Sequence, residues 1–154
     1  MLSTKLMEFL DKHKIKHEVI SHSLAYTAQE IAASAHIPGK KLAKTVIVRI
    51  DGNVAMAVLP ASYRIDLKLF KNTIGARKLE LLQEEEFKDM FPDCDIGAMP
   101  PFGNLYDMEV LVAESLAEEE EIAFNAGCHT EVIKMAYKDY ESLVKPKVMK
   151  FSFK

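Results

Sequence analysis

Lys44 opens the most strand-like segment of the sequence and is the first candidate for chemistry. Lys40-Lys41-Leu42-Ala43 precede it, and Thr45-Val46-Ile47-Val48-Arg49-Ile50 follow it. A lysine at the mouth of a buried strand is positioned by a rigid element while its amine can reach a ligand. That amine could bind phosphate or ribose oxygens, or stabilise negative charge on a carbonyl oxygen. The alternative is an exposed lysine at a strand end, since lysines are mostly exposed.

A second feature is the loop Gly97-Ala98-Met99-Pro100-Pro101-Phe102-Gly103. Glycine permits backbone angles that other residues avoid, and proline fixes φ and removes a donor, so the segment cannot be a helix or a central strand. Ala98, Met99 and Phe102 are nevertheless residues that prefer burial. A stiff, apolar loop suits one wall of a pocket. A tight turn whose Met99 and Phe102 plug the core is equally compatible with the sequence.

A third feature is the turn Gly127-Cys128-His129-Thr130 between two expected strands. His129 could orient a substrate group or transfer a proton, and Thr130 could hydrogen-bond a ligand. Cys128 is next to His129, but adjacent strand residues point to opposite faces, so a thiol–imidazole pair is not expected. His13 and His17 have a metal-like spacing, but a helix is expected to end between them. We therefore predict no metal site.

Charge is balanced overall but locally concentrated. The 154 residues include 20 Lys and Arg against 23 Asp and Glu, a net charge of −3, so a nucleic acid could be bound only by a local patch. Lys40, Lys41 and Lys44 form such a patch, although a solvated turn explains it equally well. The simplest interpretation of the acidic runs at 84–86 and 118–121 is that they form solvated faces.

Composition narrows the class of protein. Two cysteines in no CxxC pattern favour reduced thiols rather than disulfides or zinc. The start of the chain has the pattern of an amphipathic helix rather than a signal peptide, and no apolar run approaches the roughly 20 residues that span a bilayer. We therefore expect a cytoplasmic protein with no membrane partner. GxGxxG, Walker and GxSxG motifs are absent, which leaves nucleotide hydrolysis and serine-hydrolase chemistry without support.

The periodicity of apolar residues predicts helices interspersed with short strands. Residues 43–59 are the clearest hairpin, with Asp51-Gly52 between two nearly continuous apolar arms, and should be central in a sheet. We expect helices at 4–13, from Thr27 to His36, 66–72, 84–90 and 136–144. We expect further strands at 16–20, 77–82, 104–107, 109–113, 121–126, 131–135 and 148–153. The chain should be a single α/β (α+β) domain, 1–154, with a mixed, mostly antiparallel sheet flanked by helices.

The ordered set of motifs resembles the YbaK/prolyl-tRNA synthetase-associated editing domain family. The resemblance rests on the capping sequence that starts at Thr27, Lys44-Thr45, the Gly97–Gly103 loop, and the Gly127–Thr130 turn with the helix after it. It covers nearly the whole chain. It implies hydrolysis, in trans, of the ester between a wrong amino acid and tRNA, with no cofactor, no metal and no covalent intermediate.

The resemblance also implies roles for particular residues. Lys44 would be the hallmark functional residue, and the Gly97–Gly103 loop would line the aminoacyl pocket. The remaining implied substrate contacts are Tyr26, Thr27, Gly127, His129 and Thr130. Met99 departs from the smaller residue expected in that loop, so its flexible thioether could alter which amino acid fits.

Several functions remain open at this point. The leading one is an aminoacyl-tRNA deacylase whose Lys40 and Lys41 help to hold the tRNA acceptor end. An aminoacyl-tRNA synthetase would be a further partner, and DNA would not. A non-catalytic module that binds tRNA ends or an amino-acid-like ligand would use the same fold. An interaction domain with no link to tRNA is the third alternative.

Overall fold

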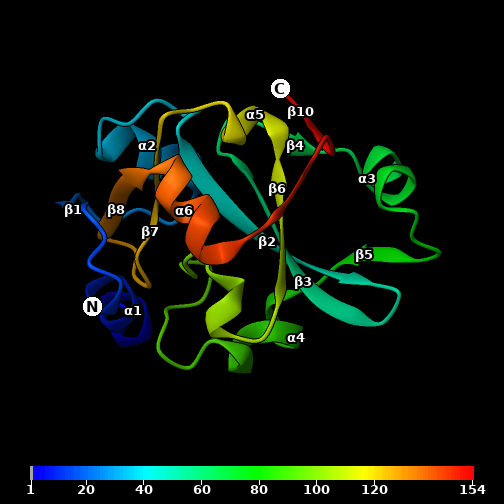
Figure 1. Cartoon of the computed structure of the whole chain (residues 1–154), viewed down its shortest axis with the longest axis horizontal. Helices are drawn as coiled ribbons and strands as arrows, with labels where there is room; N and C mark the ends of the chain where they lie inside the picture. The colour runs from blue at the N-terminus through cyan, green and yellow to red at the C-terminus, as the bar shows by residue number, and fades with distance from the viewer. Residues whose placement is uncertain (1) are drawn as a thin grey trace.

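A mixed eight-stranded sheet organises residues 2–154, the part of the chain that the computed structural model describes (Figure 1). The strands are β1 His17–Ser21, β2 Leu42–Ile50, β3 Asn53–Pro60, β4 Arg64–Ile65, β5 Leu79–Leu81, β6 Glu109–Ala113, β7 Glu121–Asn125, β8 Glu131–Ala136, β9 Lys147–Met149 and β10 Ser152–Phe153. The α-helices are α1 Thr4–Lys12, α2 Ala28–Ser34, α3 Leu67–Ile74, α4 Glu84–Phe87, α5 Glu114–Ala117 and α6 Tyr137–Val144.

The strand order of the large sheet is β1-β8-β7-β2-β3-β6-β9, with β5 also paired to β2. The pairs β1–β8, β7–β8, β2–β3 and β2–β5 are antiparallel. The pairs β2–β7, β3–β6 and β6–β9 are parallel. The predicted mixed α/β fold with helices around a largely antiparallel sheet is confirmed, and the β2–β3 hairpin lies at its centre as expected.

The hairpin turn follows from its two residues. Asp51 and Gly52 both have positive φ, 47° and 90°, which is the geometry of a two-residue turn whose twist matches that of the flanking strands. The Asp51 carboxylate also accepts hydrogen bonds from the backbone N–H groups of Arg77 and Lys78, at 2.9 and 2.8 Å. These bonds hold the chain that leads into β5 against the hairpin.

The two faces of the sheet are covered by different elements. Alternate residues of the central strands, such as Met56 and Val58, join a large core with α1, α4 and α6. Their neighbours Ala57 and Leu59 face the other way, into a cluster under α3. A third cluster lies under α2, on the same side as α3. In Figure 1, α2 lies near β8 and β7, and α3 lies at the opposite end of the molecule.

Three helices begin at side chains that cap them. The hydroxyls of Ser3 and Thr27 and the carboxylate of Asp66 accept hydrogen bonds from the backbone N–H groups of Leu6, Glu30 and Leu69. At Thr27 the Glu30 carboxylate also accepts from the Thr27 N–H at 3.3 Å, which completes the predicted capping box. Such caps fix where α1, α2 and α3 enter the fold.

The structure differs from the prediction at two segments. The expected strand 104–107 is wrong, because Gly103–Leu105 forms a 3₁₀ turn. The expected strand 148–153 is divided into β9 and β10, which pair with β6 and β4. The division follows from Phe151, which is fully buried and stacks on Phe70 with ring centroids 4.4 Å apart. Because this ring enters the cluster under α3, the chain cannot continue along β6.

Two further observations concern membranes and metals. Within residues 2–154, no helix is long and apolar enough to cross a bilayer. Over the same residues, no three His, Cys, Asp or Glu side chains are grouped so that they could hold a metal ion. His13 and His17 instead place their Nδ1 atoms 2.9 and 2.8 Å from the backbone carbonyls of Phe9 and Ile15.

Candidate functional site

Lys44 lies in the interval between the two clusters that share one face of the sheet. Its neighbours on that face, Leu42 and Val46, belong to the clusters under α2 and α3 respectively. The ammonium is half-buried and donates a hydrogen bond to the Ala61 carbonyl at 3.3 Å. Burial, and to a lesser extent the charge of Arg64, lowers the pKa of Lys44 below its ordinary value. Lys44 is thus neither the freely solvated lysine of the simpler alternative nor a paired one.

The Gly97–Gly103 loop is anchored by its backbone. Gly97 has φ 86°, and the following Ala98 N–H donates to the Asp95 carbonyl at 3.0 Å. The loop also exchanges bonds with the next feature, since the Gly127 N–H donates to Ala98 and the Asp95 N–H donates to Gly127. Gly97 is exposed, whereas residues 98–103 are all buried. What the loop offers to solvent is therefore the backbone around Gly97.

The bulky side chains of this loop are part of the main core. Met99 is 4% exposed, and Phe102 is fully buried against the rings of Phe9, Phe124 and Tyr140. The Tyr140 hydroxyl donates to the Pro101 carbonyl at 2.7 Å. The main core occupies the face of the sheet opposite to Lys44, so the structure does not bring the Met99 side chain and the Lys44 ammonium together.

The close approach of backbones explains two of the glycines. A side chain at Gly103 would place a Cβ 2.6 Å from the Met108 carbonyl oxygen. At Gly127, where φ is 98°, a Cβ would lie 2.8 Å from the Ser3 Cβ. Both distances are too short for real atoms. These glycines are needed where the loop and the turn pack against their neighbours.

His129 connects the turn to the loop. Its Nε2 lies 3.0 Å from the Ile96 carbonyl, which can only accept, so Nε2 carries a proton; in the tautomer protonated at Nε2 alone, Nδ1 is an acceptor. Nδ1 is buried and has no partner within residues 2–154. The Tyr26 ring, 64% exposed, covers His129 with centroids 4.8 Å apart. The Ala25 N–H donates to the His129 carbonyl at 3.2 Å.

The predicted site residues thus fall into groups. Tyr26, Gly97, Gly127 and His129 are brought together, and Thr27 caps the helix that follows Tyr26. The Cys128 sulfur lies 3.8 Å from the Thr130 hydroxyl and 3.8 Å from the Glu131 carboxylate. These two polar contacts of the thiol are therefore with residues other than His129.

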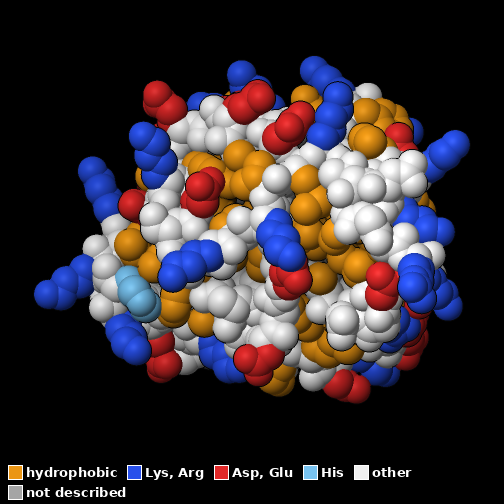
Figure 2. Space-filling model, turned by 45° about the vertical axis from the view of Figure 1, so that its right-hand side comes forward, with side chains coloured by type: hydrophobic (Ala, Val, Ile, Leu, Met, Phe, Trp, Pro, Cys, Tyr) orange, Lys and Arg blue, Asp and Glu red, His pale blue; other side chains and the backbone are white. Residues whose placement is uncertain are grey.

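Lys40 and Lys41 precede β2, and Lys41 lines a separate cavity near the start of β7. On the face drawn in Figure 2, lysine and arginine are interspersed with acidic and apolar side chains. A polynucleotide on this face would therefore be held by a few cations at defined positions rather than by a broad positive field.

Sequence reasoning missed a polar network behind the site. The Asp93 carboxylate accepts hydrogen bonds from the buried Ser3 hydroxyl and from the Tyr106 hydroxyl, the latter at 2.8 Å. The Cys94 thiol lies 3.4 Å from the Tyr106 oxygen, and burial raises its pKa to about 11. The Ser3 N–H donates to Ala126 at 2.7 Å. Ser3 is therefore bonded to both segments that flank His129, and its only signal in the sequence is its place before a helix.

Comparison with known proteins identifies the family. The model of the aminoacyl-tRNA editing domain matches residues 22–143. This chain belongs to the aminoacyl-tRNA editing domain family. The match begins directly after β1 and ends within α6, and so includes Lys44, the Gly97–Gly103 loop and His129. The resemblance stated from the motifs is confirmed.

Relatives within the editing domain family are of two kinds. Over 153 residues the chain is 26% identical to the multifunctional Ser/Thr-tRNA deacylase ProXp-y of Escherichia coli K12, covering 96% of this chain and 90% of that protein. It is 25% identical over 89 residues to the proline–tRNA ligase of Bacillus mycoides KBAB4, covering 58% of this chain but only 16% of the ligase.

Solved structures share the editing-domain fold at lower identity. The hypothetical protein APE2540 superposes with a TM-score of 0.85 at 18% identity, over 97% of this chain and 99% of that one. A protein described as a candidate trans-editing enzyme for prolyl tRNA synthetase superposes with a TM-score of 0.83 at 17% identity, over 99% and 97%. At such identities the comparison establishes the fold alone.

Proposed function

We propose that this protein hydrolyses, in trans, the ester that links a wrong amino acid to tRNA, with Lys44 acting on the reacting ester. Membership of the editing domain family supports deacylation of mischarged tRNA. The observation that carries the role of Lys44 is its position, half-buried between two clusters with its ammonium held only by the Ala61 carbonyl among the described residues.

An aminoacyl ester is already activated, so the protein needs to position it, admit water and stabilise the oxyanion. The Lys44 ammonium supplies a positive charge in a partly desolvated place, where its effect on a developing oxyanion is larger than in water. In this proposal the exposed backbone at Gly97, which lies beside His129, adds an N–H donor. Nδ1 of His129 accepts a hydrogen bond from the attacking water or from the substrate once the Tyr26 ring moves aside.

The remaining predicted residues have supporting roles in this proposal. Thr27 fixes the start of α2 and hence Tyr26, and Thr130 lies beside His129. The Gly97–Gly103 loop limits the size of the amino acid through its backbone. The buried side chains of Met99 and Phe102 fix the position of that backbone. Lys40 and Lys41 contact phosphates of the acceptor end. A rigid second sieve of this kind is useful because one methylene changes binding by only about 1–3 kcal/mol.

The substrate and partner are proposed by similarity. Ser-tRNA and Thr-tRNA lead the panel of substrates because of the similarity to the Ser/Thr-tRNA deacylase. An aminoacyl-tRNA synthetase is a proposed partner, because 58% of this chain is similar to a segment that makes up 16% of a proline–tRNA ligase.

The test is deacylation of Ser-, Thr-, Ala-, Cys- and Pro-tRNA by the wild type and by Lys44→Ala. We expect the wild type to hydrolyse at least one mischarged tRNA and Lys44→Ala to lose that activity while keeping its melting temperature. Lys12→Ala, which removes an exposed lysine from α1, is the matched control. Unchanged hydrolysis by Lys44→Ala would remove this residue from the mechanism. Binding of tRNA without any turnover would favour the non-catalytic module instead.

A further inference from the structure

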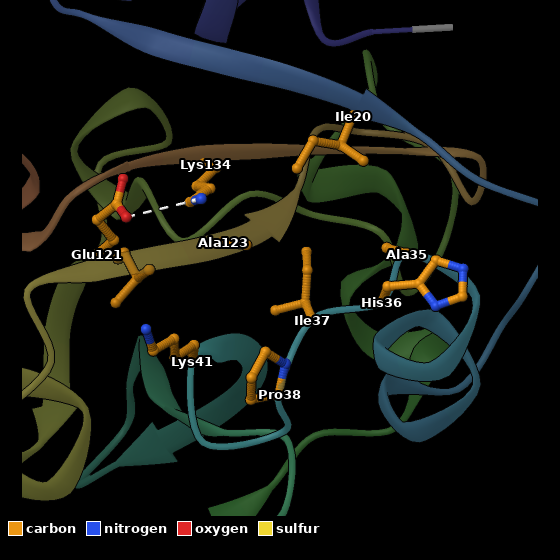
Figure 3. Close-up of a pocket in the computed structure, with 10 residues that line it drawn as sticks. Ile20, Ala35, His36, Ile37, Pro38, Lys41, Glu121, Ala123 and Lys134 are labelled. Carbon is orange, nitrogen blue, oxygen red and sulfur yellow. Dashed lines mark ion pairs between the residues drawn. The ribbon is translucent and has the colours of Figure 1, made fainter.

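A second cavity, about 180 Å³ in volume, lies on the α2 face of the sheet and contains none of the residues proposed to act on the ester (Figure 3). Ile20, Ile37 and Ala123 provide apolar walls from β1, the chain after α2, and β7. Lys41 and Lys134 provide two cations. The cavity therefore combines apolar walls with positive charge, which is the chemistry of a site for a nucleobase and its phosphate.

The cavity is lined by two lysines and one glutamate, so one positive charge is not compensated. The Lys134 ammonium lies 3.6 Å from the Glu121 carboxylate, the ion pair drawn in Figure 3. Lys41 is in no ion pair within residues 2–154, and its side chain points toward the strand that carries Ala123. One uncompensated positive charge matches the single negative charge of a phosphodiester. Because salt competes for such a contact, its contribution is detectable as a salt dependence.

His36, at the rim of the cavity, has a backbone conformation that residues other than glycine rarely adopt. Its φ is 57°, and the chain closes α2 with hydrogen bonds from His36 to Ala33 and from Ile37 to Ala32, at 3.3 and 2.9 Å. Glycine is the usual residue at this point of such a helix end. A histidine there bears a conformational cost, and the cost is compensated if its ring contacts a ligand. An imidazole at the rim can stack on a base.

The cavity lies within reach of an RNA strand that extends from the proposed ester site. Leu42 pairs with Ala123, so the cavity is at the start of β7, whereas His129 follows the other end of that strand. The four steps from Glu121 to Asn125 span about 13 Å. Only the terminal nucleotide carries the ester, so a preceding nucleotide of the single-stranded 3′ end can reach a cavity at this distance.

We propose that this cavity is a second RNA subsite, in which one upstream nucleotide of the tRNA 3′ end lays its base against Ile20 and Ile37, with His36 at the rim, and its phosphodiester on Lys41. This inference rests on the proposed function and extends it. The ester site selects the amino acid, and the cavity secures the RNA. Lys41 therefore acts on affinity for a polynucleotide and not on the bond that breaks.

The test compares two substrates that differ only in the upstream RNA: a full aminoacyl-tRNA and the corresponding aminoacyl-adenosine. For Lys41→Ala we expect KM for aminoacyl-tRNA to rise about three- to tenfold, with kcat unchanged. Hydrolysis of aminoacyl-adenosine should be unaffected. The slope of log affinity against log salt for uncharged tRNA should become shallower by about 0.7, the value for one phosphate of a single strand. Lys41→Arg should restore most of the affinity, and Lys12→Ala is the matched loss of one exposed lysine.

A second variant addresses the base. His36→Gly removes the ring and relieves the positive φ, so it should raise the melting temperature while weakening tRNA binding. A purely structural role would move both quantities in the same direction. Equal loss with aminoacyl-adenosine, or no loss of tRNA affinity in either variant, would overturn the proposed subsite. If the wild type hydrolyses neither substrate, the deacylase function fails, and direct binding of uncharged tRNA by these variants still decides whether the cavity is an RNA subsite.

Discussion

The two faces of the central sheet are built for different purposes. On one face, α1, α4, α6 and the Gly97–Gly103 loop close a continuous core that includes Met99 and Phe102. On the other, α2 and α3 cover separate clusters, and Lys44 lies in the interval between them. The loop that is the most unusual segment of the sequence is thus mainly packed, while an ordinary-looking lysine has the unusual environment. In this fold the loop provides rigidity, and the interval between the clusters under α2 and α3 holds the lysine that we propose to act on the ester.

The largest expected effect is on the packed face. Phe102→Ala should lower the free energy of unfolding by about 3–5 kcal/mol, because a fully buried ring in contact with three others is lost. Urea denaturation at neutral pH measures this loss. Phe153→Ala, at a ring that is 50% exposed, is the control and should change the stability by less than about 0.5 kcal/mol. A stable Phe102→Ala protein that accepts larger amino acids would show that the loop side chains line the pocket.

The next effect concerns the opposite face and the charge of Lys44. Burial and the Arg64 charge lower the pKa of Lys44, so its ammonium loses its proton at a lower pH than an exposed lysine does. If the charged form stabilises the oxyanion, kcat/KM should fall as pH rises, starting below the ordinary lysine pKa of 10.5. Initial rates corrected for uncatalysed ester hydrolysis provide the profile. In Lys44→Arg any remaining activity should lack this alkaline decline, since arginine keeps its charge. If Lys44→Arg shows the same alkaline decline in kcat/KM as the wild type, the decline arises from the titration of a group other than Lys44.

A smaller effect should come from the polar network of Ser3, Asp93, Cys94 and Tyr106 beside the main core. Burial alone raises the pKa of the Asp93 carboxyl, but hydrogen bonds from Ser3, Tyr106 and Cys94 outweigh it and leave the pKa below its ordinary value. The folded state therefore gains stability that is present above the unfolded pKa and is lost as pH falls through the lowered one. Ser3→Ala should cost about 1–2 kcal/mol at pH 7, through the lost helix cap and this bond.

Denaturation of the wild type and Ser3→Ala at neutral pH and at about pH 3 checks this prediction. The difference between the two proteins should shrink as the pH falls through the lowered pKa of the Asp93 carboxyl. Ser3→Thr retains the hydroxyl and should keep most of the stability. A difference independent of pH would mean that only the helix cap is at work.

The smallest effect is expected at the exposed rim. Tyr26→Ala should leave the free energy of unfolding within about 0.5 kcal/mol of the wild type, because the ring is largely exposed. It should alter KM by a few-fold, since it uncovers His129. Tyr26→Phe keeps the ring and should behave like the wild type. If Tyr26→Ala lowers the free energy of unfolding by more than about 1 kcal/mol, Tyr26 has a structural role rather than a role in the site.

Local signals in the sequence predicted most of the fold. The Asp51-Gly52 turn, the Thr27 capping box and the apolar arms of the hairpin each depend on neighbouring residues, and each is present as expected. The segment 148–153 was predicted incorrectly because its break depends on the burial of Phe151 against Phe70, a contact between distant residues.

The candidate site was predictable to a smaller extent. The ordered motifs located Lys44, the loop and His129, and the family match includes all three. They could not show that Met99 and Lys44 lie on opposite faces, because that depends on how the loop packs against the sheet. Neither the bonds from Ser3 to the two segments beside His129 nor the cavity beside Lys41 leaves a pattern in the sequence, since each joins residues far apart in the chain.

The burial of Ser3 has a practical consequence for handling the protein. Its N–H and hydroxyl are bonded within the fold, next to a glycine that tolerates no added atoms. A purification tag or fluorophore attached just ahead of Ser3 would press on the segment that leads to His129 and could distort measurements of activity. Lys154 is exposed at the other end of the chain, so labels for tRNA-binding assays belong there.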